Sequence, residues 1–75
     1  MNAGNRKKAW VKYLLSLKIL ETKDNGISKA ELRKDEKTGS YAIVVFLRGD
    51  YEESFSENIY TRDTILQIWK NWLED

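Results

Sequence analysis

The chain has 75 residues, a third of which are charged, and a formal net charge of +1. It contains neither Cys nor His, which excludes disulfides, zinc-finger and haem-type ligation, and catalysis by a thiolate or an imidazole. A chain of this length builds one small core, and we expect a single compact domain over residues 1–75. No apolar run approaches the roughly 20 residues that cross a bilayer, and no signal-peptide core follows the basic start. We therefore expect a cytoplasmic protein without a membrane partner.

Charge is distributed unevenly along the sequence. Up to Arg48 there are eleven Lys or Arg residues against five Asp or Glu, whereas from Gly49 onward there are two against seven. Such a layout either lets the two parts of the chain attract each other or orients a charged partner. Attraction between the two parts of the chain is the more common reason for such a layout.

Good helix formers occupy residues 6–21, after a start over residues 1–5 that we expect to be frayed. Two apolar stripes run along the expected helix. The first consists of Trp10, Tyr13, Leu14, Leu17 and Leu20. The second consists of Val11, Leu15 and Ile19, and it is flanked by Lys7, Lys8, Lys12 and Lys18. The expected helix therefore offers more apolar surface than one core contact requires.

The segment over residues 27–37 is compatible with two structures. As a helix, it has a capping box at Ser28 and Glu31 and a stop at Gly39. As a strand, it pairs with the following apolar run through the polar turn "DEKTG". We favour the strand, because a Gly-bearing polar turn directly before a β-rich run is the usual hairpin arrangement.

The run "YAIVVFL" over residues 41–47 is the clearest strand, given its β-branched and aromatic content. After a turn at "RGDYE", the segment "ESFSENIY" predicts a third strand with Phe55 and Ile59 on one face. Thr61 then predicts the N-cap of an amphipathic helix that runs to Leu73. Asp63 in its first turn is favourable near the positive end of the helix dipole.

The expected fold is α+β: a three-stranded antiparallel meander flanked by N- and C-terminal helices (α-β-β-β-α), with both helices on one sheet face. The middle strand is apolar on both of its faces. Tyr41, Ile43, Val45 and Leu47 face one side, and Ala42, Val44 and Phe46 face the other. We expect the second face to be shaded partly by long neighbouring side chains and partly by another protein chain.

The remaining residues favour binding over catalysis. Glu52, Glu53 and Glu57 form an acidic cluster that matches no calcium loop, and charges that protect a sheet edge from aggregation explain it better than a metal or acid–base role. The "RGD" of residues 48–50 is typical of a turn, and the Gly residues form no phosphate-binding or dinucleotide pattern. We therefore expect no enzyme, no metal and no cofactor.

The leading hypothesis is a small non-catalytic protein-binding module that acts stoichiometrically as a regulator or inhibitor of a larger protein or complex. Surplus apolar surface on the first helix and the central strand favours it. The expected contact residues are Trp10, Val11, Leu15 and Ile19 with Lys8 and Lys12, together with Val44 and Phe46. The partner is either another protein or a second copy of the chain in a homodimer. By analogy alone, phages and mobile elements encode compact, charged, Trp-bearing chains of this size that block host proteins.

The alternative hypothesis is a nucleic-acid-binding α-β-β-β-α domain. Its expected contacts are Arg6, Lys7, Lys8 and Lys12 on the first helix, with Lys29 and Arg33 on the first strand. The element order resembles in outline that of the double-stranded-RNA-binding domain and of three-stranded integrase-type DNA readers. The RNA-binding family begins its last helix with clustered Lys residues, whereas this chain has "TRDTILQ" there. The resemblance is limited to the order of the elements.

Overall fold

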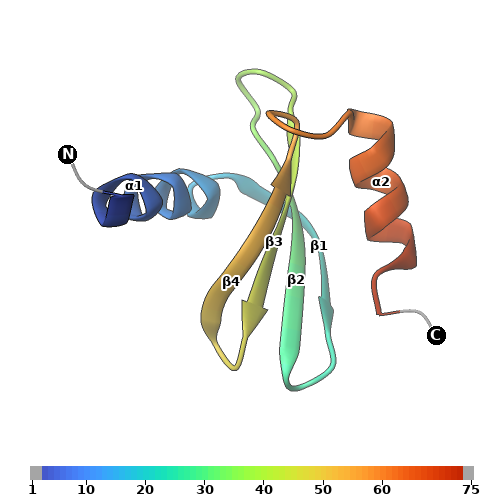
Figure 1. The fold of residues 1–75 in the computed structure, drawn as a ribbon. Helices are drawn as coiled ribbons and strands as arrows, with labels where there is room; N and C mark the ends of the chain where they lie inside the picture. The colour runs from blue at the N-terminus through green and yellow to red at the C-terminus, as the bar shows by residue number, and fades with distance from the viewer. Residues whose placement is uncertain (1–2, 74–75) are drawn as a thin grey trace.

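The computed structural model describes the backbone of residues 3–73 and the side chains of residues 7–73. The elements of that range are α1 (Ala3–Leu15), β1 (Lys18–Asp24), β2 (Ser28–Lys34), β3 (Tyr41–Leu47), β4 (Asp50–Ser56) and α2 (Arg62–Asn71). The strands form one antiparallel meander in the order β1-β2-β3-β4 (Figure 1). The α+β class with an antiparallel sheet is confirmed, and the expected number of three strands is wrong.

The additional strand, β1, occupies a segment that we expected to be helical. α1 ends at Leu15, and the Ser16 hydroxyl that follows donates to the Tyr13 carbonyl. A serine hydroxyl bonded to a preceding helical carbonyl competes with continuation of the helix. The next residues include Ile19 and Thr22, whose branched side chains suit a strand, and the segment pairs with β2 along its length. The expected helix to residue 21 is therefore wrong, and Ile19 lies on β1.

Two of the expected strands lie near their expected positions. Residues 27–37 contain β2, so the strand interpretation is confirmed and the helical alternative is wrong. β4 begins at Asp50, earlier than expected, because Arg48 and Gly49 make a two-residue turn with φ of 52° and 88°. Positive φ at both central positions is typical of a type I′ hairpin turn, and Gly adopts it without steric cost. Ile59 consequently lies in the loop before α2, where it is 81% exposed.

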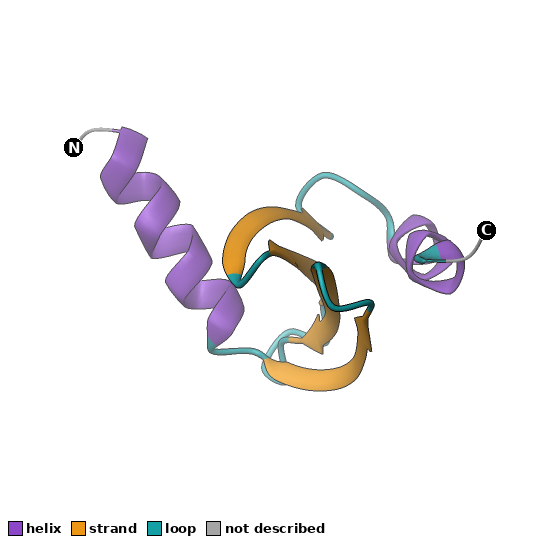
Figure 2. Ribbon diagram, turned by 90° about the horizontal axis from the view of Figure 1, so that it is seen from below, coloured by secondary structure: helices purple, strands orange, loops and turns teal. Residues whose placement is uncertain are grey.

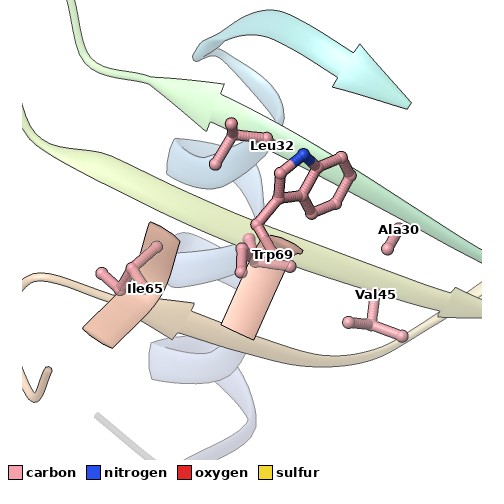
Figure 3. Packing of buried hydrophobic residues seen from close by; sticks show 6 residues of the cluster. Ala30, Leu32, Val45, Ile65 and Trp69 are labelled. Atoms are coloured by element: carbon pink, nitrogen blue, oxygen red, sulfur yellow. The ribbon is translucent and has the colours of Figure 1, made fainter. Parts of the chain in front are cut away.

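The two helices cover opposite faces of the sheet, as Figures 1 and 2 show from two directions. Alternate residues of β3 therefore supply two cores. In the first, α2 packs on the sheet (Figure 3), and the buried residues are Ala30, Leu32, Ile43, Val45, Ile65 and Trp69. In the second, α1 packs on the other face, and the buried residues are Leu14, Ala42 and Val44. The expected packing of both helices on one face is wrong, because β3 is apolar on both faces and each face receives a helix.

A buried ion pair fixes the C-terminal end of α1. Arg33 and Glu31 on β2 are 6% and 5% exposed, and the Arg33 guanidinium donates to the Glu31 carboxylate. The same guanidinium donates to the carbonyl oxygens of Leu15 and Leu17, at 3.0 Å each. Carbonyl groups at a helix C-terminus have no partner within the helix, and the helix dipole favours a cation there. Arg33 therefore holds α1 against the sheet.

β1 holds the other helix in a similar way. The Lys23 ammonium donates to the carbonyl oxygens of Trp69 and Trp72 at the C-terminus of α2, and it lies 4.9 Å from the centroid of a Trp69 ring. The Trp69 indole N–H donates to the Glu21 carboxylate at 2.8 Å. At its other end α2 starts after Thr61, which is the N-cap as predicted. Both helices therefore end on a cation supplied by the sheet.

Candidate functional site

A shallow, wide-open apolar groove of about 430 Å³ lies along α1, beside Tyr51 of β4. Its lining residues are Lys7, Lys8, Val11, Lys12, Leu15 and Tyr51. It lies on the α1 side of the sheet, away from α2 (Figure 2). The groove combines three apolar side chains with three ammonium groups, and it contains four of the eight residues that we expected to contact a partner protein.

The outer flank of α1 forms one wall of the groove. Leu14 is fully buried against β3, which fixes the orientation of the helix. Val11 and Leu15 are one helical turn apart and therefore lie on one flank. Leu15 is 46% exposed, although it belongs to a helix that contributes to the core. The helix therefore packs on the sheet through Leu14 and still exposes an apolar stripe on its flank.

Tyr51 on β4 forms the opposite wall and is held in place by hydrogen bonds. Its hydroxyl donates to the Ser54 hydroxyl oxygen at 3.1 Å, and the Trp10 indole N–H donates to the same oxygen, also at 3.1 Å. Ser54 thereby links β4 to α1. Phe46 lies beside Tyr51 in the register of β3 and β4. The aromatic wall is therefore fixed from two elements before any partner binds, which lowers the entropic cost of binding.

The groove is positively charged at its rim. Lys7, Lys8 and Lys12 are all exposed, and none of the described residues that line the groove is acidic. A concave surface lined by charges of one sign attracts a partner of the opposite sign. The aliphatic stems of these lysines also extend the apolar area around Val11 and Leu15. The arrangement suits a partner that is apolar at its centre and anionic around it.

The structure distributes the expected protein-contact residues over three environments. Val11, Leu15, Lys8 and Lys12 meet in the groove. Trp10 is half-buried, does not line the groove and donates to Ser54, and Phe46 is half-buried beside Tyr51. Ile19 is 47% exposed on β1 and does not line the groove. Val44 is fully buried under α1, so its expected role as a surface contact is wrong.

The expected nucleic-acid contacts are also divided. Lys7, Lys8 and Lys12 line the groove, and Lys29 lies on the same side of the sheet, 5.2 Å from the centroid of the Phe46 ring. Arg33 is buried, and its guanidinium is bonded to Glu31 and to the end of α1. The prediction that Arg33 contacts phosphate is therefore wrong.

The start of the chain is described only in part. α1 begins at Ala3, so the backbone of residues 3–5 is helical in the structure, and the expected fraying of residues 1–5 stays a prediction. Residues 1–2 lie outside the described range. Arg6 lies in α1, but its side chain is not among those that the structure describes. The expected contact of Arg6 with phosphate therefore falls outside the described residues.

Tyr51 is the groove residue that the sequence analysis missed. We placed it in a turn, because the third strand was expected to begin at residue 53. The signal that identifies it is the Arg48-Gly49 pair, which makes a two-residue turn and starts β4 at Asp50. With that turn, Tyr51 pairs with Phe46 and faces α1.

One member of the acidic cluster, Glu57, has a structural role. Glu57 accepts the Tyr41 amide at 2.6 Å and pairs with Arg62 at 3.4 Å. Among the described residues, no group of three or more acidic side chains is placed to hold a metal ion. Within residues 3–73, none of the helices has the length and apolar character needed to span a membrane.

A hydrogen bond outside the groove makes the stability of the fold depend weakly on pH. The Tyr13 hydroxyl donates to the Asp35 carboxylate at 2.7 Å and connects α1 to the β2–β3 turn. This bond raises the pKa of Tyr13, and it lowers the pKa of Asp35 together with the Lys37 amide. The lowered pKa of Asp35 stabilises the fold above about pH 3.9 and is lost as the pH falls, whereas the raised pKa of Tyr13 stabilises it below about pH 10 and is lost as the pH rises.

We expect Tyr13→Phe to lower the melting temperature slightly between these limits and to leave it unchanged at both extremes. Because both groups are exposed, the effect is small. Thermal unfolding at several pH values measures it, with Tyr60→Phe as a control at a second exposed tyrosine. Equal pH profiles for Tyr13→Phe and the unmodified chain contradict the assignment.

No protein-family model matches this sequence, and no curated protein and no solved structure matches it either. The function of the groove therefore has to be argued from its own chemistry.

Proposed function

We propose that this chain is a small non-catalytic protein-binding module that acts by occupancy, as a stoichiometric regulator or inhibitor of a larger protein or complex. The observation that carries the proposal is the groove between α1 and β4, with Val11, Leu15 and Tyr51 at its centre and lysines around them. Apolar side chains inside a polar rim are the usual composition of a protein-binding surface.

The core between α1 and the sheet is complete without the apolar residues of the groove. Leu14 already attaches α1 to Ala42 and Val44, and Arg33 secures the end of the helix. The fold therefore does not need Leu15 at the surface, and an exposed leucine beside a fixed aromatic side chain is suited to an external contact. The surplus apolar surface is smaller than the sequence suggested, because the second face of the sheet is covered by α1.

Nucleic acid is the second candidate, because Lys7, Lys8 and Lys12 share one flank and Lys29 lies near Phe46 on the same side. Contacts with phosphates give affinity that falls steeply with salt. The apolar centre of the groove favours a protein, since phosphates gain nothing from Val11 and Leu15. Changing the three groove lysines to Gln distinguishes the two, because it abolishes binding of nucleic acid, whereas it weakens binding of a protein but leaves its contact with Val11 and Leu15.

We expect Leu15→Asp to weaken partner binding about tenfold or more, since it places a charge where about 1.5–3 kcal/mol of apolar burial is otherwise available. A photo-reactive phenylalanine analogue at position 15, in cells of the source organism, identifies the partner by mass spectrometry. The matched position is Leu66, which is 37% exposed on α2 at the opposite side of the sheet.

The expected result is a nuclease-resistant adduct with another protein from position 15, which is absent from position 66. The isolated partner then binds the Leu66→Asp variant normally and the Leu15→Asp variant weakly. An adduct that nuclease removes assigns the groove to nucleic acid, and an adduct between two copies of the chain assigns it to a homodimer. Both outcomes contradict the proposed function.

A further inference from the structure

We infer that the groove binds an acidic amphipathic helix of the partner protein. The inference rests on the proposed function and names the kind of segment that occupies the site. The electrostatic argument comes first: Lys7, Lys8 and Lys12 surround an apolar centre, and no acidic residue is among the described lining residues. A segment with carboxylates beside its apolar stripe brings them within reach of these ammonium groups, whereas a basic or neutral segment leaves the lysines unpaired.

The shape of the α1 wall favours a helix. Lys7, Val11 and Leu15 follow one another at intervals of four residues and form a ridge along α1. The ridge is about 12 Å long, from eight residues at about 1.5 Å each, which matches two turns of a second helix. Ridges of this spacing fit the grooves of an adjacent helix, and an apolar helix face laid into a groove is a common mode of peptide recognition.

The position of α1 leaves room for such a segment. Figure 2 shows α1 on the side of the sheet away from α2, with much of its length extending beyond the strands. The groove itself is wide open to solvent, and a helix parallel or antiparallel to α1 can contact Leu15 and Tyr51 together.

The composition of β4, the strand that borders the groove, disfavours an extended segment. β4 contains Asp50, Glu52 and Glu53, and its register with β3 shifts between Val45 and Phe46. Acidic side chains and a bulge on an edge strand hinder pairing with a further strand. An acidic strand is repelled there by like charges, so an acidic partner binds against α1 and Tyr51 without extending the sheet.

The test uses five probes of known chemistry with the full chain. The first is a synthetic peptide of about 14 residues, roughly four helical turns, with Leu at helical spacing and Glu at the other positions. The second has the same composition with Leu and Glu in alternation, and the third has Lys in place of Glu. The fourth is an oligothymidine of about 16 nucleotides, the upper size of a single-strand site. Phosphatidylglycerol vesicles test whether the lysines and Leu15 bind an anionic membrane surface instead.

We expect the first peptide to bind with a dissociation constant in the micromolar range, at least tenfold more tightly than the other probes. Amide chemical-shift changes in the ¹⁵N-labelled chain are expected at Val11, Leu15 and Tyr51. Leu15→Asp and the milder Leu15→Gln are expected to weaken binding at least tenfold and about threefold, and the amide spectrum shows whether each variant is folded. Lys12→Gln weakens binding, whereas Lys70→Gln on α2 is the matched control and leaves it unchanged.

The failures are distinguishable. No binding of the first peptide, equal binding of the alternating or Lys-containing peptide, or shifts away from the groove overturns the acidic helix and leaves the crosslinking test of the proposed function standing. Tighter binding of oligothymidine or of the vesicles through Lys7, Lys8 and Lys12 overturns both the inference and the proposed function.

Discussion

Glu31→Leu is expected to lower the free energy of unfolding by about 3–5 kcal/mol, because it leaves the Arg33 guanidinium buried without its counter-charge. Both residues are almost completely inaccessible, and each is the main charged partner of the other. The total stability of a chain of 75 residues is roughly 4–11 kcal/mol at about 0.05–0.15 kcal/mol per residue. The loss is therefore a large part of the total. Urea unfolding followed by tryptophan fluorescence measures it.

The double variant Glu31→Leu with Arg33→Met separates the ion pair from the helix cap. Replacing a whole buried pair by apolar residues of similar volume is often neutral or stabilising. We expect the double variant to recover most of the stability that the single variant loses. The double variant does not recover the cap at the C-terminus of α1, because the carbonyl oxygens of Leu15 and Leu17 lose the guanidinium that donates to them. Hydrogen exchange is then expected to rise in α1 more than in the sheet.

A single variant within about 1 kcal/mol of the unmodified chain contradicts the buried pair, since the cost of an unpaired buried charge exceeds that value. Arg33→Lys supplies a second check. Lysine keeps the charge but lacks the planar fork that reaches Glu31 and two carbonyls at once. We expect it to be less stable than the unmodified chain and more stable than Glu31→Leu.

The central strand shows how much of the fold the sequence contains. The alternation in residues 41–47 predicted which side chains share a face, and the structure confirms both sets. The sequence pattern also raised the question of what covers the second face. It did not identify α1 as the answer, because the same helix carries two apolar stripes and nothing local says which of them meets the sheet. Leu14 decides this by packing on Val44.

β1 is the element that local sequence reasoning missed. Lys, Leu and Glu favour a helix as isolated residues, and nearly every side chain of β1 is exposed. Its strand conformation depends on backbone pairing with β2 and on Glu21 and Lys23, which contact α2 from a distance of more than forty residues in sequence. Tertiary contacts of this kind override propensity and leave no periodic signal.

The candidate site was predictable in part for related reasons. The helical spacing of Val11 and Leu15 identified the apolar flank and its lysines without any knowledge of the sheet. Tyr51 required the register of β4, which depends on one two-residue turn. Arg33 violated the rule that arginine is exposed, because the end of α1 supplies acceptors that no sequence pattern shows. The residues of the site that lie on α1 could therefore be predicted from the sequence, whereas the contacts that join several elements could not.

Trp69→Ala is expected to lower the free energy of unfolding by about 3–5 kcal/mol, the usual cost of removing a buried Trp or Phe side chain. Trp69 is 5% exposed and contacts the sheet together with Ile65. Its loss also removes the donor to Glu21 and the ring beside Lys23. Urea unfolding provides the measurement, and a change below about 1 kcal/mol contradicts the burial of the side chain.

Phenylalanine at the same position isolates the hydrogen bond, and Trp72 provides the matched control. The Trp69 indole N–H is bonded, whereas the Trp72 indole N–H is buried with no acceptor within the described part of the chain. We expect Trp69→Phe to cost about 1 kcal/mol more than Trp72→Phe, since only the first loses a made bond. Because Glu21 and Lys23 belong to β1, hydrogen exchange in Trp69→Ala is expected to increase in β1 and α2 together while α1 keeps its protection. That pattern would show that β1, the strand that the sequence did not predict, stabilises α2 in addition to the core that α2 shares with β2 and β3.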